Sequence, residues 1–329
     1  MRKHRVAVVI GGFSGESEVS IQSGKTVLTN LNPSECEAYP VYITPKDWYC
    51  EYKGRRYPID KNDFSISGVS PSLRFDVVFN AIHGSPGEDG MLAGYFDMLG
   101  IPHTSCQVFE SALTFNKVEC TALCRELGVT APLQKVLTRW QPYTVAEIMD
   151  AVALPCFVKP SRSGSSIGVS RVNEEEHLAK AIATAFTIDD KVIIEELIQG
   201  REVGCGVSNH NGYPQPLAIT DIVPKNDFFD YESKYSGLSE EITPARISEA
   251  AYQQIMEESQ HLYESLRLSG LVRMDYIVSA DEVPFFIEIN SIPGLSAESI
   301  VPKQLDYLHL TKQEVFGKML WQALQNKSL

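Results

Sequence analysis

Two carboxylates, an amide and a guanidinium recur at alternate positions near the end of the chain. Residues 270–294 read GLVRMDYIVSADEVPFFIEINSIPG, two apolar runs around a short polar turn, which predicts a β-hairpin. Because side chains two apart share one face of a strand, Arg273 joins Asp275 and Glu288 joins Asn290. Folding at the turn brings Asp275 opposite Glu288, to within a residue or two.

This hairpin cluster requires a counter-ion, because burying unpaired charges costs several kcal/mol each. Its candidate ligands Asp275, Glu288 and Asn290 are all oxygen donors, with no His or Cys among them, which favours Mg²⁺ over Zn²⁺. A surface salt-bridge cluster is the competing interpretation. The strongly apolar flanks of both strands favour the metal site.

Two lysines and a loop of small residues offer cations and amide donors. Lys159 ends an apolar strand and leads into the phosphate loop, residues 161–169, SRSGSSIGV, which can fold over phosphates or be a plain surface loop. Lys117 lies in the first turn of a helix predicted over 116–127, where the helix dipole disfavours a cation. With the oxygen ligands, these groups suit a nucleoside triphosphate.

Two further features fit the same interpretation. Glu195 and Glu196 precede Leu197-Ile198 on a strand predicted over 191–198, so they could accept from a ribose and frame an adenine. Arg273 would stand where negative charge develops during phosphoryl transfer or on a tetrahedral intermediate.

The N-terminal elements predict a doubly wound α/β domain that ends near residue 106. Strands are expected over 6–10, 38–43 and 77–80, the first followed by a helix over 17–31. Glu16 would lie at the positive end of that helix, where it can reach a ligand. A Gly-rich loop, 83–90, opens the next helix, through residue 99. Neither GxGxxG nor a P-loop is present.

The remaining elements complete three predicted units, 1–106, 107–200 and 201–329. The last begins with a strand over 202–207 and has a loop of irregular pattern at 227–239. A long amphipathic helix over 247–268 precedes the hairpin, a loop is expected over 295–302, and a closing helix over 311–324.

Bulk composition narrows the class of protein. The 329 residues carry a net charge of −13, which argues against nucleic-acid and anionic-membrane partners. Seven scattered cysteines without a CxxC pair fit reduced thiols, and no apolar run approaches the roughly 20 residues of a membrane helix. We therefore expect a cytoplasmic protein.

Taken together, six motifs resemble those of the D-alanine–D-alanine ligases, members of the ATP-grasp superfamily. They span almost the whole chain, in order and at plausible separations. They are GGFSGESEVS (11–20), HGSPGEDG (83–90), VKPSRSGSSIGVS (158–170), DYESKY (230–235), RMD (273–275) and EINSIPG (288–294).

The resemblance implies a mixed α/β, three-domain ATP-grasp fold and a ligase of peptidoglycan precursor synthesis. The carboxylate of one D-alanine attacks the γ-phosphate of ATP, and the amine of a second D-alanine then attacks the acyl phosphate. ATP and two Mg²⁺ ions, with Mn²⁺ as a substitute, are the implied cofactors, and a homodimer is the implied assembly.

The resemblance also implies residue roles. Substrates would be held by Glu16, His83, Lys234 and Ser299. ATP would be held by Lys117, Lys159, Ser165, Ser166, Glu195, Glu196, Leu197, Ile198 and Glu202. Metal would be held by Asp275, Glu288 and Asn290, and the intermediate by Arg273 and the Gly294 amide. Tyr235 would meet Glu16 and Ser165 across the closed site.

Three alternatives remain open. Tyr235 indicates a dipeptide-forming ligase but does not separate D-alanine from D-serine as acceptor. Residues 164–168, GSSIG, satisfy the GxSxG pattern of serine hydrolases, which requires a helix directly after the serine, whereas residues 169–172 are predicted as a strand and argue against it. An ATP-binding regulator without turnover is the non-enzyme alternative, against which the retention of Arg273, Asp275, Glu288 and Asn290 argues.

Overall fold

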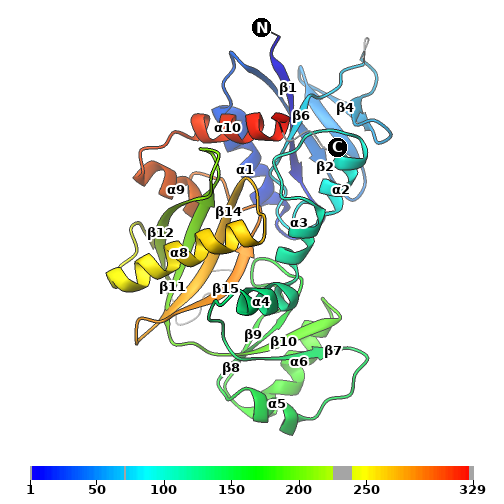
Figure 1. The fold of residues 1–329 in the computed structure, drawn as a ribbon. Helices are drawn as coiled ribbons and strands as arrows, with labels where there is room; N and C mark the ends of the chain where they lie inside the picture. The colour runs from blue at the N-terminus through cyan, green and yellow to red at the C-terminus, as the bar shows by residue number, and fades with distance from the viewer. Residues whose placement is uncertain (1, 70–71, 225–238, 326–329) are drawn as a thin grey trace.

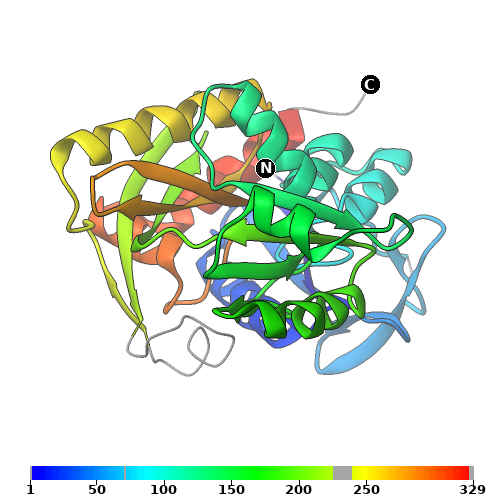
Figure 2. The same cartoon turned by 90° about the horizontal axis from the view of Figure 1, so that it is seen from below.

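Three β-sheets follow one another along the chain in the computed structural model, which describes residues 2–69, 72–224 and 239–325 (Figure 1). The sheet of the N-terminal residues lies at one end of the molecule and a four-stranded sheet at the other. From below, the four-stranded sheet covers the middle of the view, with the five-stranded sheet to its left (Figure 2). Predicted residues Lys234 and Tyr235 lie outside the described residues.

The first sheet has a parallel core, as predicted, with β2, β1 and β6 side by side. Antiparallel strands β3, β4 and β5, which were not predicted, extend it at one edge. The elements are β1 (His4–Gly11), α1 (Ser17–Asn30), β2 (Cys36–Ile43), β3 (Trp48–Tyr52), β4 (Arg55–Asp60), β5 (Ser65–Ile66), β6 (Val77–Asn80) and α2 (Met91–Met98).

Strand β1 is buried on both faces, which explains its continuous apolar sequence. Val8 and Ile10 share a core with Val27 of α1 and Phe316 of the C-terminal helix α10 (Lys312–Gln325). Val9, pointing the other way, lies in a second core with residues of α2. Helices therefore cover both faces of the parallel strands, confirming the doubly wound prediction.

The second sheet is antiparallel, in the order β7-β10-β8-β9, with a core that includes side chains of α5 and α6. Strand β10 ends at Glu196, so the strand predicted over 191–198 was two residues too long. The elements are β7 (Gln134–Thr138), α5 (Val145–Ala151), β8 (Cys156–Pro160), β9 (Ser170–Val172), the 3₁₀ turn η1 (Glu175–His177), α6 (Leu178–Phe186) and β10 (Lys191–Glu196).

The third sheet is also antiparallel, in the order β13-β12-β11-β14-β15. Its last two strands are the predicted hairpin. The prediction of a loop over 295–302 was wrong for the last three residues. Helix α9 begins at Ile300 and accommodates Pro302 in its first turn. The elements are β11 (Gly200–Ser208), β12 (Gln215–Pro224), β13 (Ser239–Ile242), α8 (Glu249–Ser265), β14 (Leu271–Ser279), β15 (Pro284–Asn290) and α9 (Ile300–Tyr307).

Two helices, α3 (Val108–Phe115) and α4 (Lys117–Glu126), link the first sheet to the second. Cys120 and Cys124 of α4 belong to the same core as β11 and β14, so α4 packs on the third sheet rather than the second. All seven cysteines are free thiols. Among the described residues, no helix combines the length and apolarity needed to cross a membrane.

Candidate functional site

The hairpin cluster forms in the register that alternation predicts. Asp275 lies opposite Glu288, and Arg273 lies opposite Asn290. The Arg273 guanidinium donates two parallel hydrogen bonds to the Asp275 carboxylate, at 2.7 Å and 2.8 Å, and Asn290 donates a third at 3.0 Å. Burial opposes the charge on Arg273, but Asp275 and Glu288 outweigh it and raise the pKa of the guanidinium. The cluster is therefore charged and internally ordered.

Helix α4 brings Lys117 to the hairpin, which explains a cation in the first turn of a helix. Its Nζ lies 3.2 Å from Glu288 Oε2 and donates to the Ser163 carbonyl oxygen at 2.6 Å. Burial disfavours the charged lysine, yet the Glu288 carboxylate outweighs burial, and the pKa of Lys117 is raised. Lys117 thus connects the oxygen-rich hairpin with the phosphate loop.

Lys159 and Glu195 form a buried ion pair in the second sheet. Lys159 Nζ lies 2.6 Å from Glu195 Oε1, and Gln134 donates to the other carboxylate oxygen, also at 2.6 Å. Both partners are under a tenth exposed. The next carboxylate, Glu196, accepts from the Leu133 amide at 2.7 Å. Both carboxylates thus bond other groups of the protein, and neither the Lys159–Glu195 pair nor the Glu196 contact was predicted.

Half-buried residues continue from Glu196 through Leu197 and Ile198 at the end of β10. Leu197 and Ile198, two residues of the predicted adenine pocket, therefore follow the end of the strand. Glu202 lies on β11, two residues before Gly204, whose partner across the ladder is Asp275. Alternation therefore places Glu202 on the same sheet face as the hairpin cluster.

The phosphate loop reaches the N-terminal unit. The Ser165 hydroxyl donates to the Glu16 carboxylate, and Glu16 is the cap residue before α1, as predicted. Ser165 and Ser166 both have positive φ, 51° and 57°, a strained conformation for side-chain-bearing residues. A β-carbon at Gly164 would overlap the Glu16 carboxylate. A turn and β9 follow the serines instead of a helix, so the serine-hydrolase alternative was wrong.

His83 is buried and bonded to protein on both ring nitrogens. Its Nδ1 lies 2.8 Å from the Ile292 carbonyl oxygen and its Nε2 lies 2.9 Å from Ser23 Oγ. Burial lowers the pKa of His83, which favours the neutral ring. The structure thus places His83 beside the segment after β15.

Glu88 is the principal residue that sequence reasoning missed. Its carboxylate accepts from the Gly84 amide at 2.6 Å and from the Ile292 amide at 3.2 Å. Burial first, and the neighbouring Glu16 carboxylate second, raise the pKa of Glu88 to about 8. A carboxylate within a Gly-rich loop was the available signal, because such loops bring charged side chains close to backbone amides.

Gly294 and Ser299 lie in contact beyond the hairpin. A β-carbon at residue 294 would stand 2.6 Å from Ser299 Oγ, so any larger residue there would force the Ser299 side chain to shift. Ser299 is the cap residue of α9, and its hydroxyl pairs with Ser296 Oγ at 2.8 Å.

The donor set fits a hard divalent cation. Asp275 and Glu288 offer carboxylate oxygens, and Asn290, whose Nδ2 donates to Asp275, would offer its carbonyl oxygen. The fit rests on the chemistry of these donors and on the register that brings them onto one face. Mg²⁺ and Mn²⁺ both prefer such oxygen ligands.

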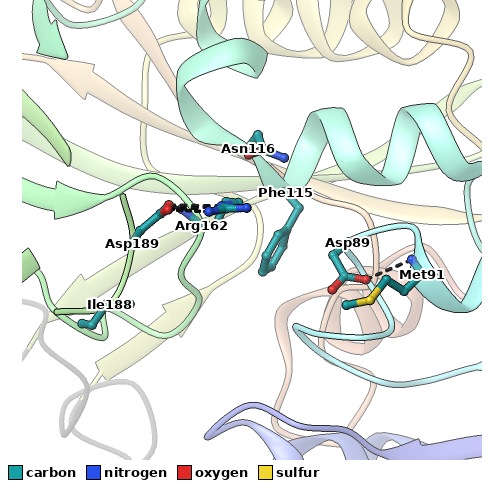
Figure 3. A pocket seen from close by; sticks show the side chains of 7 residues that line it. All are labelled: Asp89, Met91, Phe115, Asn116, Arg162, Ile188 and Asp189. Carbon is teal, nitrogen blue, oxygen red and sulfur yellow. Dashed lines mark hydrogen bonds and ion pairs between the residues drawn. The ribbon is translucent and has the colours of Figure 1, made fainter. Parts of the chain in front are cut away.

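A cavity of roughly 360 Å³ is lined by residues of the Gly-rich loop 83–90, the start of α2, the junction of α3 and α4, the base of the phosphate loop and the turn before β10. Arg162 and the buried Asp189 close one wall through an ion pair of 2.7 Å, while Asp89 bonds the Met91 amide (Figure 3). Phe115 projects between these two groups. None of the predicted site residues lines this cavity, whose lining residues are Asp89, Met91, Phe115, Asn116, Arg162, Ile188 and Asp189.

Known proteins match this chain over nearly its whole length. Residues 5–106 match the family model described as D-ala D-ala ligase N-terminus, and residues 123–320 match D-ala D-ala ligase C-terminus. A D-alanine--D-alanine ligase of Flavobacterium psychrophilum is 42% identical over 98% of this chain and 98% of its own length.

Solved structures extend the likeness to the fold. D-alanyl-alanine synthetase A of Vibrio cholerae superimposes with a TM-score of 0.90 and 26% identity, covering 99% of this chain and 100% of that one. The VanG D-Ala:D-Ser ligase of Enterococcus faecalis gives 0.83 and 31%, covering 100% of both chains. The chain therefore belongs to the D-alanine–D-alanine ligase family and has its ATP-grasp fold.

Proposed function

We propose that the protein joins two D-alanine molecules into D-alanyl-D-alanine, with ATP converted to ADP and phosphate. The observation that carries the proposal is the hairpin cluster, where Asp275 and Glu288 face each other beside Lys117 and the phosphate loop. Family membership over the full chain supports the same reaction. The product would serve peptidoglycan precursor synthesis.

For the nucleotide, Lys117 and Lys159 would neutralise phosphate oxygens. Lys159 uses one of its three N–H donors on Glu195, which leaves two for a phosphate. Ser165 and Ser166 would cover the phosphates from the loop. The remaining contacts would come from Glu195, Glu196, Leu197 and Ile198 around the adenine and from Glu202 on the ribose.

Asp275, Glu288 and Asn290 would hold two Mg²⁺ ions, with Mn²⁺ as a substitute. When bound, such ions neutralise the charge of the triphosphate and orient its γ-phosphoryl group. The Arg273 guanidinium already lies against Asp275, so it would add positive charge at the same face.

For the amino acids, Glu16 would bind the ammonium of the first D-alanine. The carboxylate oxygen of this substrate attacks the γ-phosphorus, and ADP leaves, giving an acyl phosphate. The amine of the second D-alanine attacks the acyl carbon, and phosphate leaves with the electron pair of the broken C–O bond while the amine loses a proton. Arg273 and the Gly294 amide would stabilise the tetrahedral oxyanion. Ser299 would bind the second carboxylate, together with Lys234, and Tyr235 would help to close the site.

D-alanine is the proposed acceptor rather than D-serine. The Flavobacterium D-alanine--D-alanine ligase is 42% identical to this chain, whereas the D-Ala:D-Ser ligase is 31% identical. Tyr235 supports dipeptide formation over ester formation. The D-serine alternative is therefore not favoured.

We further propose a cytoplasmic homodimer of three-unit subunits, divided at about residues 106 and 200. Seven free thiols support a reducing compartment. Helices α2 and α3 expose large apolar side chains that a second copy could cover: Met91, Met98, Val108 and Phe109.

The decisive test is product identification by mass spectrometry after incubation with Mg·ATP. D-alanine alone should yield D-alanyl-D-alanine, and equimolar D-serine or D-lactate should leave it the main product. If a product that contains D-serine or D-lactate exceeded D-alanyl-D-alanine, the protein would instead be a variant ligase with the same catalytic core. Absence of any dipeptide or depsipeptide would refute the proposed function.

A further inference from the structure

We propose that Ser23, His83 and Glu88 form a clasp that positions residues 292–295, and with them the Gly294 amide, for acyl transfer. Ser23 and Glu88 then act as positioning residues. The inference rests on the proposed ligase function, because it concerns the segment assigned to the tetrahedral intermediate.

One continuous hydrogen-bond chain runs through the clasp. The Leu295 amide donates to Ser23 Oγ at 3.0 Å, and Ser23 Oγ lies 2.9 Å from His83 Nε2. His83 Nδ1 lies 2.8 Å from the Ile292 carbonyl oxygen. A carbonyl oxygen can only accept, so Nδ1 carries the proton and Nε2 accepts from the Ser23 hydroxyl. Every donor and acceptor in the chain is matched.

Glu88 completes the clasp from the same loop as His83. Its Oε1 accepts from the Ile292 amide at 3.2 Å, so both backbone groups of Ile292 are bound by residues of one loop. Its Oε2 accepts from the Gly84 amide at 2.6 Å, which fixes the carboxylate. The Leu295 side chain is buried in the core that contains Val27 of α1. Gly294 is therefore held on both sides.

The position of the clasp relates it to the reaction and not only to folding. A β-carbon at residue 294 would stand 2.6 Å from Ser299 Oγ, so a displaced 292–295 segment would change the spacing between the amide donor and the proposed carboxylate-binding hydroxyl. Helix α1 also carries Glu16 at its start, on the first-substrate side. The clasp thus links the binding of the first D-alanine to the geometry that the second one meets.

Ser20 provides a matched control. It lies on the same helix, one turn before Ser23, and both serines are fully buried. Its hydroxyl also makes one accepted and one donated bond, from the Gly11 amide at 3.0 Å and to the Ala81 carbonyl oxygen at 2.8 Å. Neither bond reaches residues 292–295. Ser23→Ala and Ser20→Ala therefore remove equal numbers of bonds from different places.

The first measurement is hydrogen exchange of the peptide 291–299 in the full-length protein. Ser23→Ala should speed exchange there by roughly tenfold, whereas Ser20→Ala should leave it at the wild-type rate. Equal exchange in the wild type and Ser23→Ala would overturn the clasp, whether or not the wild type makes product.

The second measurement separates positioning from stability through steady-state kinetics. Ser23→Ala should lower kcat roughly tenfold and raise the KM for the acceptor D-alanine, with the KM for ATP unchanged. Ser20→Ala should retain wild-type values. Glu88→Gln keeps one acceptor oxygen for two amides and should show the same split. If both serine variants behave alike while the wild type is active, the proposed positioning role is wrong. A wild type without product would refute the ligase proposal instead.

Discussion

The hairpin cluster and the phosphate loop differ in what holds them. In the hairpin, Arg273, Asp275, Glu288 and Asn290 project from two paired strands whose backbone ladder fixes their spacing. The phosphate loop, residues 161–169, lies between β8 and β9 and contains two serines with positive φ. Side-chain bonds tie its middle to Glu16 and Lys117, while Ser161 and Arg162 at its base bond α4 and Asp189. One region is built into a sheet, and the other is attached to neighbouring units.

This difference assigns separate tasks to the two regions. A ladder cannot rearrange without losing many backbone bonds, so the hairpin suits an ion site whose oxygen ligands must keep their geometry. A loop attached by a few contacts can open to admit ATP and close over its phosphates. Changes in the hairpin should therefore abolish chemistry, whereas changes in the loop should alter nucleotide affinity and closure.

The largest effect is expected from Glu288→Gln. The substitution removes one carboxylate charge from the proposed metal set and from the partner of Lys117, so turnover should fall at least about a hundredfold. Phosphate release from Mg·ATP with D-alanine measures it. Asp281→Asn, an exposed acid on the turn of the same hairpin, is the control and should stay near wild type. Unchanged turnover of Glu288→Gln would contradict the assignment of Glu288 as a metal ligand.

Lys159→Ala tests the nucleotide side of the comparison. Loss of one phosphate cation should raise the KM for ATP by roughly tenfold or more, with a smaller change for D-alanine. The variant also leaves Glu195 buried with only Gln134 as partner, which should cost about 3–5 kcal/mol of stability. Adding Glu195→Gln should restore much of that stability without restoring ATP affinity. If ATP use by Lys159→Ala were normal, the role of this lysine would have to be withdrawn.

Ser165→Ala tests closure of the loop. It removes the bond to the Glu16 carboxylate, and a hydrogen bond to a charged group is worth about 1.5–3 kcal/mol, so kcat should fall roughly tenfold or more. Ser163→Ala provides the comparison, because its hydroxyl bonds Ile167 within the loop. Greater loss in Ser163→Ala than in Ser165→Ala would show that internal order of the loop matters more than its attachment.

The smallest effect is expected from Arg162→Ala, at the base of the loop. Burial raises the pKa of Asp189, but Arg162 and backbone amides outweigh burial and lower it. A lowered carboxyl pKa stabilises the fold above the ordinary value near 4, and this contribution disappears as pH falls through the lowered value. Because Arg162 is half exposed, the loss at pH 7 should be only about 1 kcal/mol.

Urea unfolding at pH 7 and pH 3 measures this difference, which should shrink at the lower pH. Arg56→Ala breaks an exposed ion pair with Glu51 and should cost less. A difference for Arg162→Ala that did not change with pH would contradict the proposed contribution of Asp189.

The sequence predicted the parts of the molecule in which local pattern determines structure. Strand β6 was placed at its observed bounds, and the alternation in the hairpin paired Asp275 with Glu288. The start of α9 was not predicted, because Pro302 suggested a loop. Proline is nevertheless tolerated in the first turn of a helix.

Contacts between segments far apart in the chain were not predicted from the sequence. Glu88 was overlooked because its partner Ile292 lies 204 residues away, and the ion pair of Glu195 with Lys159 depends on the order of strands in the sheet. Packing of α4 on the third sheet likewise follows from tertiary structure, which no local periodicity encodes. The individual site roles and the three-unit boundaries stay predictions.

The most direct test of the account is phosphate release by the unaltered protein, measured with and without D-alanine and with and without Mg²⁺. If the hairpin cluster couples ATP to dipeptide formation, release will require ATP, Mg²⁺ and D-alanine together. Phosphate release that does not depend on D-alanine, or no release with any D-amino acid, would contradict the proposed function without affecting the fold assignment.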